Sequence, residues 1–124
     1  MKKVLVVDDE QDFCRLVKRS LEAEGKFQVI MAIDGISALQ LARKEKPDII
    51  LLDVMMPGMS GGEVAEALQE SPATRTIPII FVTAIVSDSE LLENDGCIGS
   101  RMFIAKPVSV GELREKISIA LDKK

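Results

Sequence analysis

Five polar residues at four points of the chain have the types and spacing of a site that could transfer phosphoryl groups. They are Asp8, Asp9, Asp53, Thr83 and Lys106. The chain has no histidine, tryptophan or tyrosine, which excludes His-based triads, His metal sites and a Tyr acid or base. Any chemistry therefore falls to carboxylates, Lys, Thr, Ser or Cys.

The three carboxylates need a cation beside them if they converge. At separations of about 5 Å, two carboxylates repel by about 3 kcal/mol at an effective dielectric of about 20. An all-oxygen set favours a hard cation, and Mg²⁺ fits a site with few carboxylates and room for a phosphate. Lys106 would add a fixed positive charge and Thr83 a hydroxyl donor. A carboxylate is then the only credible covalent acceptor. Taken singly, Asp and Thr are equally typical of helix caps and loops.

Short apolar runs predict the elements that would position these residues. Five such runs recur: Val4–Val7, Phe27–Ala32, Ile49–Leu52, Ile77–Val82 and Met102–Ala105. Most are continuous, which is typical of strands buried on both faces. The intervening segments have helical spacing, and Ser60, Ser87 and Ser109 each begin an S-x-x-E capping box. This alternation predicts a doubly wound α/β fold with a five-stranded parallel sheet, in which the polar residues share the carboxyl edge.

Length and composition narrow the class of protein. With 124 residues, 47% of them hydrophobic, the chain fits a single domain over residues 1–124, and we expect no effector domain. A net charge of −4 disfavours direct nucleic-acid binding. Cys14 and Cys97 lack the spacing of a metal site, so we expect two buried thiols in a reducing cytosol. No segment has the ~20 apolar residues of a membrane span or the core of a signal peptide, so we expect a cytoplasmic protein.

The sequence around the candidate residues resembles the receiver domain of two-component response regulators. The likeness is carried by Asp8-Asp9, by residues 53–61 (DVMMPGMSG), by Thr83-Ala84 and by Lys106-Pro107, and it covers essentially the whole chain. It implies a flavodoxin-like (βα)5 fold with strand order 2-1-3-4-5.

The resemblance also implies a role for each acidic residue. Asp53 would be the phosphoacceptor and would take a phosphoryl group, as an acyl phosphate, from a sensor kinase phosphohistidine or a small phosphodonor. Asp9 and Asp53 would ligate Mg²⁺ directly, Asp8 would do so through water, and the backbone carbonyl of Met55 would complete the protein ligands. Lys106 would pair first with the Asp53 carboxylate and then with the phosphoryl group.

A second set of residues would couple phosphorylation to a conformational change of the domain. Thr83 would hydrogen-bond a phosphoryl oxygen, and Phe103 would turn inward behind it as the switch aromatic. Phe103 stands where the family often has Tyr, so it lacks the hydroxyl, and it could also be a plain core residue. The Lys106-Pro107 peptide would be cis, as is usual in the family. Apolar Met55 and Ile85 would flank the phosphoryl group and make self-dephosphorylation slow.

The implied function is a phosphorylation-activated signalling switch that changes its partner-binding surface, and not a multiple-turnover enzyme. Its partners would be a sensor histidine kinase or phosphotransfer protein, and a downstream protein or effector domain. A phosphorylation-dependent dimer is compatible with this resemblance. However, Arg101-Met102 stands where many winged-helix regulators carry acidic residues, so we do not expect their dimer through the fourth and fifth helices.

Three other functions are less consistent with these residues. A Mg²⁺-dependent aspartyl-phosphate phosphatase or phosphotransferase would act on external substrates, but such sites usually have a second Asp where this chain has Met55. A flavodoxin-like electron carrier is disfavoured because Asp8-Asp9 would repel a phosphate-bearing cofactor. A degenerate receiver that only binds partners is disfavoured because the set Asp8, Asp9, Asp53, Thr83 and Lys106 is intact.

Overall fold

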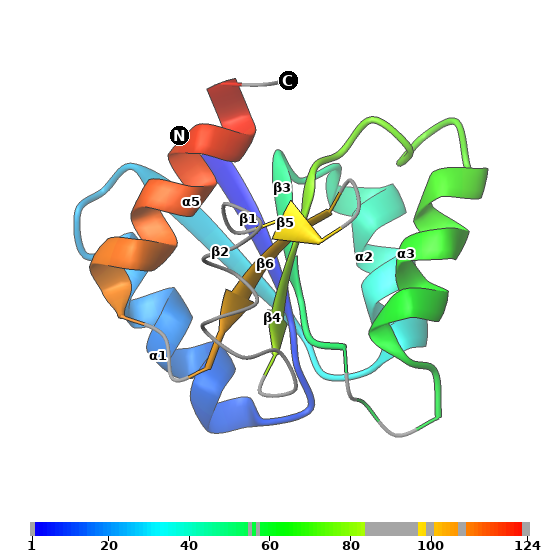
Figure 1. Cartoon of the computed structure of the whole chain (residues 1–124), viewed down its shortest axis with the longest axis horizontal. Coiled ribbons are helices and arrows are strands. Elements are labelled where there is room, and N and C mark those ends of the chain that lie inside the picture. The colour runs from blue at the N-terminus through cyan, green and yellow to red at the C-terminus, as the bar shows by residue number, and fades with distance from the viewer. Residues whose placement is uncertain are drawn as a thin grey trace.

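The computed structural model of the chain describes residues 2–54, 56, 58–83, 97–98, 101–106 and 109–122, apart from the side chains of residues 83, 97, 98 and 101. Figure 1 shows strands at the centre of the molecule and helices around them. The helices are α1 (Gln11–Glu22), α2 (Gly35–Glu45), α3 (Gly61–Glu70) and α5 (Val110–Asp122). The strands are β1 (Lys2–Val7), β2 (Phe27–Ala32), β3 (Ile49–Leu52), β4 (Ile79–Thr83), β5 (Cys97–Ile98) and β6 (Arg101–Ala105).

The strands form one sheet in the order β2-β1-β3-β4-β6-β5. The first five of these are parallel to their neighbours, and β6 is the fifth parallel strand along the chain. The predicted doubly wound sheet and its order 2-1-3-4-5 are therefore confirmed. One addition was not predicted: the two residues of β5 pair antiparallel with the outer edge of β6.

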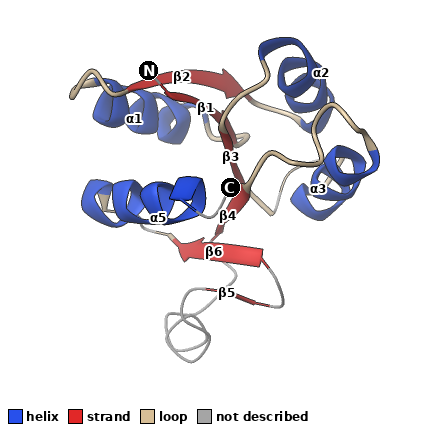
Figure 2. Cartoon of the chain, turned by 90° about the horizontal axis from the view of Figure 1, so that it is seen from above, coloured by secondary structure: helices blue, strands red, loops and turns tan. Residues whose placement is uncertain are grey.

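The helices lie on both faces of this sheet. Figure 2 shows α1 and α5 on one face and α2 and α3 on the other. The side chains of β1 alternate between the two cores: Val4 and Val6 pack on the α1 and α5 side, whereas Leu5 and Val7 pack on the α2 and α3 side. This double burial explains why the strand reads as a continuous apolar run.

Local signals set the helix ends. The Ser60 hydroxyl accepts a hydrogen bond from the Glu63 backbone, and the Glu63 side chain accepts one from the Ser60 backbone, as the capping box predicts. The Glu112 backbone likewise donates to the Ser109 hydroxyl, at 3.1 Å. After α1 the chain turns at Gly25, whose φ of +74° favours glycine. The helix predicted from Ser87 lies outside the described residues.

No helix in the described part of the chain has the length and apolar character needed to cross a membrane.

Candidate functional site

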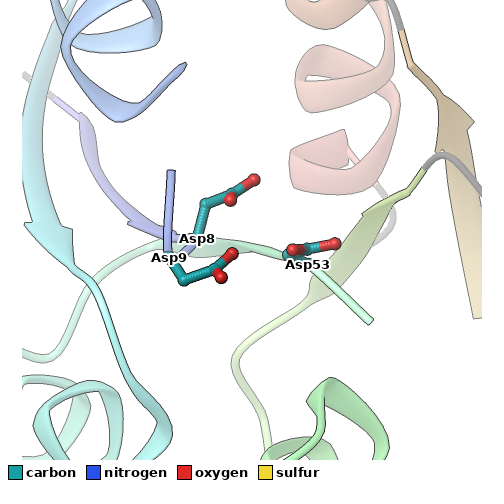
Figure 3. A group of neighbouring side chains, drawn as sticks. All are labelled: Asp8, Asp9 and Asp53. Carbon is teal, nitrogen blue, oxygen red and sulfur yellow. The ribbon is translucent and has the colours of Figure 1, made fainter. Parts of the chain in front are cut away.

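The three candidate carboxylates lie together at the carboxyl edge of the sheet. Asp8 and Asp9 directly follow β1, and Asp53 directly follows β3 (Figure 3). Backbone hydrogen bonds continue the sheet past the strand ends: the Asp8 N–H donates to the Ala32 carbonyl at 3.1 Å, and the Asp53 N–H donates to the Val7 carbonyl at 2.9 Å. The parallel register of β1 and β3 therefore fixes the two acidic segments relative to each other.

The spacing of these carboxylates fits a shared cation. One oxygen from each of Asp8, Asp9 and Asp53 lies within 4.8 Å of the others. Oxygens on opposite sides of a Mg²⁺ ion are about 4 Å apart, because each Mg–O distance is about 2.1 Å. Small side-chain adjustments would therefore bring the ligands around one ion. Asp8 and Asp53 are buried and Asp9 is exposed, so the cluster opens to solvent on one side.

Both oxygens of Asp8 already have hydrogen-bond donors. Its Oδ1 accepts from the Glu10 backbone N–H at 2.9 Å, and its Oδ2 accepts from the Lys106 ammonium at 2.7 Å. The side chain is only 1% exposed. The water-mediated role expected for Asp8 stays a prediction.

The ammonium of Lys106 sits within the acidic cluster. It also lies 3.1 Å from the Glu10 carboxylate and 4.6 Å from the centre of the Phe13 ring, and its side chain is 15% exposed. Burial alone would lower the pKa of Lys106. The hydrogen bonds to Asp8 and Glu10 and the charge of Asp53 outweigh it, so the pKa is raised above its ordinary value and the amine stays charged. Its described hydrogen bonds are to Asp8 and Glu10, and the expected pairing with Asp53 stays a prediction.

Cys14 lies directly beneath this cluster. Its thiol is buried, as predicted, and lies 3.4 Å from the backbone carbonyl of Asp8, to which it donates. Burial, with the nearby charge of Asp8, raises the pKa of Cys14 from 9.0 to about 11. The thiol is therefore protonated at neutral pH. The side chain of Cys97 lies outside the described part.

Phe103 packs in the core on the α2 and α3 side of the sheet. Its ring stacks on that of Phe81, with centroids 5.0 Å apart and an angle of 23° between the planes. Phe103 is only partly buried. It has the packing of a core residue, and part of its surface is exposed.

Several predicted site residues remain untested. Thr83 ends β4 and pairs with Ala105 in the sheet, but its side chain is not described. Met55, Ile85 and Pro107 lie outside the described residues, so the carbonyl ligand, the shielding of the phosphoryl group and the cis peptide stay predictions.

Two contacts at the site were not anticipated. The first is the pairing of Glu10 with Lys106, since Glu10 was expected only as part of the acidic turn. The second is the close approach of Gly61 to the backbone of Asp53. A Cβ atom on Gly61 would collide with the Asp53 carbonyl oxygen and lie 2.8 Å from the Val54 Cα. The repeated glycines at positions 61 and 62 were the signal available in the sequence.

The fold and the acidic edge define a class of protein. The family model described as "Response regulator receiver domain" matches residues 4–118, and the chain belongs to this family of two-component systems. Receiver domains are phosphoacceptor switches that interact with histidine kinases and downstream effectors, and they generally bind Mg²⁺ at an acidic pocket.

Particular relatives resemble the chain to different extents. Response regulator PleD of Caulobacter vibrioides is 42% identical over 106 residues, which are 86% of this chain and 23% of PleD. The chain therefore spans less than a quarter of that relative. Polar-differentiation response regulator DivK of Brucella anthropi is 37% identical over 118 residues, 94% of this chain and 93% of DivK. The solved structure of chemotaxis protein CheY4 of Vibrio cholerae matches with a TM-score of 0.82 and 30% identity, covering 97% of this chain and 98% of that one.

Proposed function

We propose that this chain is a phosphorylation-activated switch in which Asp53 accepts a phosphoryl group from a phosphohistidine or a small phosphodonor. The observation that carries the proposal is the convergence of three carboxylates within 4.8 Å, with the Lys106 ammonium bound at their edge. Asp53 is the candidate acceptor because it is the carboxylate that directly follows β3, which is the position the receiver-domain family implies for the acceptor.

Asp9 and Asp53 would hold Mg²⁺ directly and Asp8 would do so through water. When bound, the ion neutralises the charge of the phosphoryl group during transfer. The carboxylate of Asp53 forms the new O–P bond, and the donor's bond to phosphorus breaks. Asp53 is itself only 5% exposed.

The same residues would convert phosphorylation into a change of shape. Lys106 would shift from Asp8 toward a phosphoryl oxygen, and Thr83 would donate to another. Each such charged hydrogen bond contributes about 1.5 to 3 kcal/mol, and reversing a 1:99 population needs about 5.5 kcal/mol. Phe103 would follow by leaving its present position against Phe81. The binding surface that results would select a downstream partner or effector domain.

Covalent labelling of the full chain tests the proposal. Incubation with acetyl phosphate and Mg²⁺ should give a single phosphoryl adduct by intact mass spectrometry, and chelation of the metal ion should strongly reduce it. Asp53→Asn should abolish the adduct. Asp12→Asn is the matched control, because Asp12 lies in the first turn of α1 with a fully exposed side chain, and it should leave labelling unchanged.

Two results would contradict this function. One is an adduct of equal yield on the Asp53→Asn chain, which would place the acceptor elsewhere. The other is sustained hydrolysis of an aryl phosphate over many turnovers, which would indicate a phosphatase acting on external substrates.

A further inference from the structure

An exposed apolar surface lies beside the acidic cluster, around the end of β2 and the start of α2. Three of the five large hydrophobic side chains that are exposed in the described part of the chain fall within six residues of each other. They are Met31, Ile33 and Ile36, with exposed fractions of 39%, 45% and 64%. We call these residues, with the two hollows described next, the β2–α2 surface.

Two hollows lie on this surface and share Ser37 as a wall. The larger, about 550 Å³, lies between α1 and α2 over the end of β2 and has Met31, Ile33 and Leu41 among its lining residues. The smaller, about 350 Å³, lies between the start of α2 and Met59. Ile36 borders the smaller hollow. Figure 2 shows β2 at the end of the sheet, with α1 and α2 on either side of it.

The charged residues that line the larger hollow are both positive. Of the described residues that line it, only Arg15 and Lys44 are charged, although the chain has four more acidic than basic residues. Lys44 pairs with no carboxylate in the described part of the chain. Arg15 contacts Asp12 only at 3.5 Å, in a pair that is largely exposed and therefore contributes little. Both cations are available to a partner.

We propose that the β2–α2 surface docks a partner protein through an amphipathic helix whose polar side is acidic. Apolar side chains of the helix would enter the hollows, and its carboxylates would pair with Arg15 and Lys44. The surface continues past the larger hollow to Ile36 and the second hollow, which suits an elongated segment better than a compact small molecule.

A second copy of this chain would fit the surface less well. If the same surface of the second copy were used, it would bring another Arg15 and Lys44 to the contact. Among the described residues that line the two hollows the only acidic one is Asp34, in the smaller hollow. The Asp34 carboxylate already accepts the Ser37 N–H at 2.7 Å, as the cap of α2. Charge complementarity therefore favours a different, acidic partner.

Three synthetic peptides of about 18 residues would test this, since that length can form a helix. They would share one apolar face of Leu and Phe, and their polar faces would carry Glu, Lys or Gln. Titrated into the full chain and followed by amide chemical shifts, the Glu peptide should bind tightest. Its shifts should map to residues 11–15, 31–37 and 40–44, and its affinity should fall with added salt.

Variants on the surface make the test specific. The double variant Arg15→Glu and Lys44→Glu should lower the affinity for the Glu peptide by about tenfold or more and raise the affinity for the Lys peptide. Ile33→Asp should also weaken binding. Leu16→Asp is its control, because Leu16 is also an exposed apolar residue but faces α5 and lines neither hollow. Circular dichroism would confirm that each variant is folded.

The proposal is overturned if no peptide binds, if the three bind equally, or if Leu16→Asp weakens binding as much as Ile33→Asp does. It is also overturned if sedimentation shows that the chain alone dimerises and that Ile33→Asp makes it monomeric, because the occupant is then a second copy.

Discussion

The Lys106 ammonium lies 2.7 Å from Oδ2 of Asp8, and this bond joins the end of the fifth parallel strand to the end of the first. The Asp8 side chain is almost completely buried, and Asp53 adds a second buried carboxylate nearby. Lys106 therefore offsets the repulsion of the acidic cluster when no metal ion is bound.

Replacing Lys106 by methionine should destabilise the chain. The change keeps most of the side-chain volume but leaves Asp8 buried without its cation, and breaking such a pair costs about 3 kcal/mol. Urea unfolding would measure this loss, and added Mg²⁺ should restore more stability in the variant than in the wild type. Lys18→Met is the control, because Lys18 pairs with Glu22 at the surface, and it should cost about 1 kcal/mol or less. Equal losses from the two variants would contradict the prediction.

Alanine substitutions at the neighbouring residues Gly61 and Gly62 should change the stability of the chain in opposite directions. Gly61→Ala would place a methyl group against the Asp53 and Val54 backbone, which should cost about 2 kcal/mol or more and slow phosphorylation by displacing Asp53. Gly62→Ala meets nothing closer than the Ser60 hydroxyl at 3.8 Å, so it should stabilise α3 by up to about 1 kcal/mol. Thermal unfolding and phosphorylation rates of the two variants would measure both effects. A Gly61→Ala chain with wild-type stability would show that this contact can relax freely.

Glu22 should make stability depend on pH in acid. Its carboxylate accepts from the Val29 N–H at 2.9 Å and from Lys18 at 3.0 Å, and these bonds, the backbone bond first, lower the pKa of Glu22 below 4.5. When the pKa of a carboxyl is lower in the folded than in the unfolded chain, its charged form stabilises the fold. That stabilisation is fully present at a pH above the unfolded-state pKa and is lost as the pH falls through the folded-state pKa. Glu22→Gln should therefore cost about 1 kcal/mol or less at neutral pH, and the difference should shrink below about pH 4.5. Glu66→Gln, on the exposed side of α3, is the control in the same unfolding series.

The Phe103 ring should report phosphorylation directly. The chain has four phenylalanines, so fluorine NMR of fluorophenylalanine-labelled protein should give four resolved signals, assigned by single Phe→Leu variants. Beryllofluoride with Mg²⁺ should move the Phe103 signal, as the ring leaves Phe81, and the Phe13 signal, because that ring contacts Lys106. Phe27, at the start of β2, is the internal control. An unmoved Phe103 signal at saturating beryllofluoride would argue that the residue is only part of the core.

Most of the fold could be predicted because burial on both faces leaves a clear pattern. Val4–Val7 and Ile49–Leu52 are continuous apolar runs, and the structure buries every side chain in them. The two residues of β5 carry no such pattern, since a strand that short has no periodicity to detect. The acidic residues could be placed because each follows a predicted strand, so the sheet itself brings them together.

Other features depend on side-chain positions that spacing does not encode. Glu10 and Lys106 are 96 residues apart, and their contact follows from side-chain conformations at the end of the sheet. Likewise, Met31 belongs to an apolar run that predicts burial, but β2 is the outermost strand at its side of the sheet. Its side chain is 39% exposed because it lies at the rim of the sheet, where it lines the hollow between α1 and α2.

The hydrogen bond from the Asp53 N–H to the Val7 carbonyl has an evolutionary consequence. The backbones of the two acidic segments are joined by the sheet itself, so substitutions on the outer faces of the helices can accumulate without altering their separation. A lineage of such domains can thereby acquire new binding specificities while its phosphate chemistry stays constant.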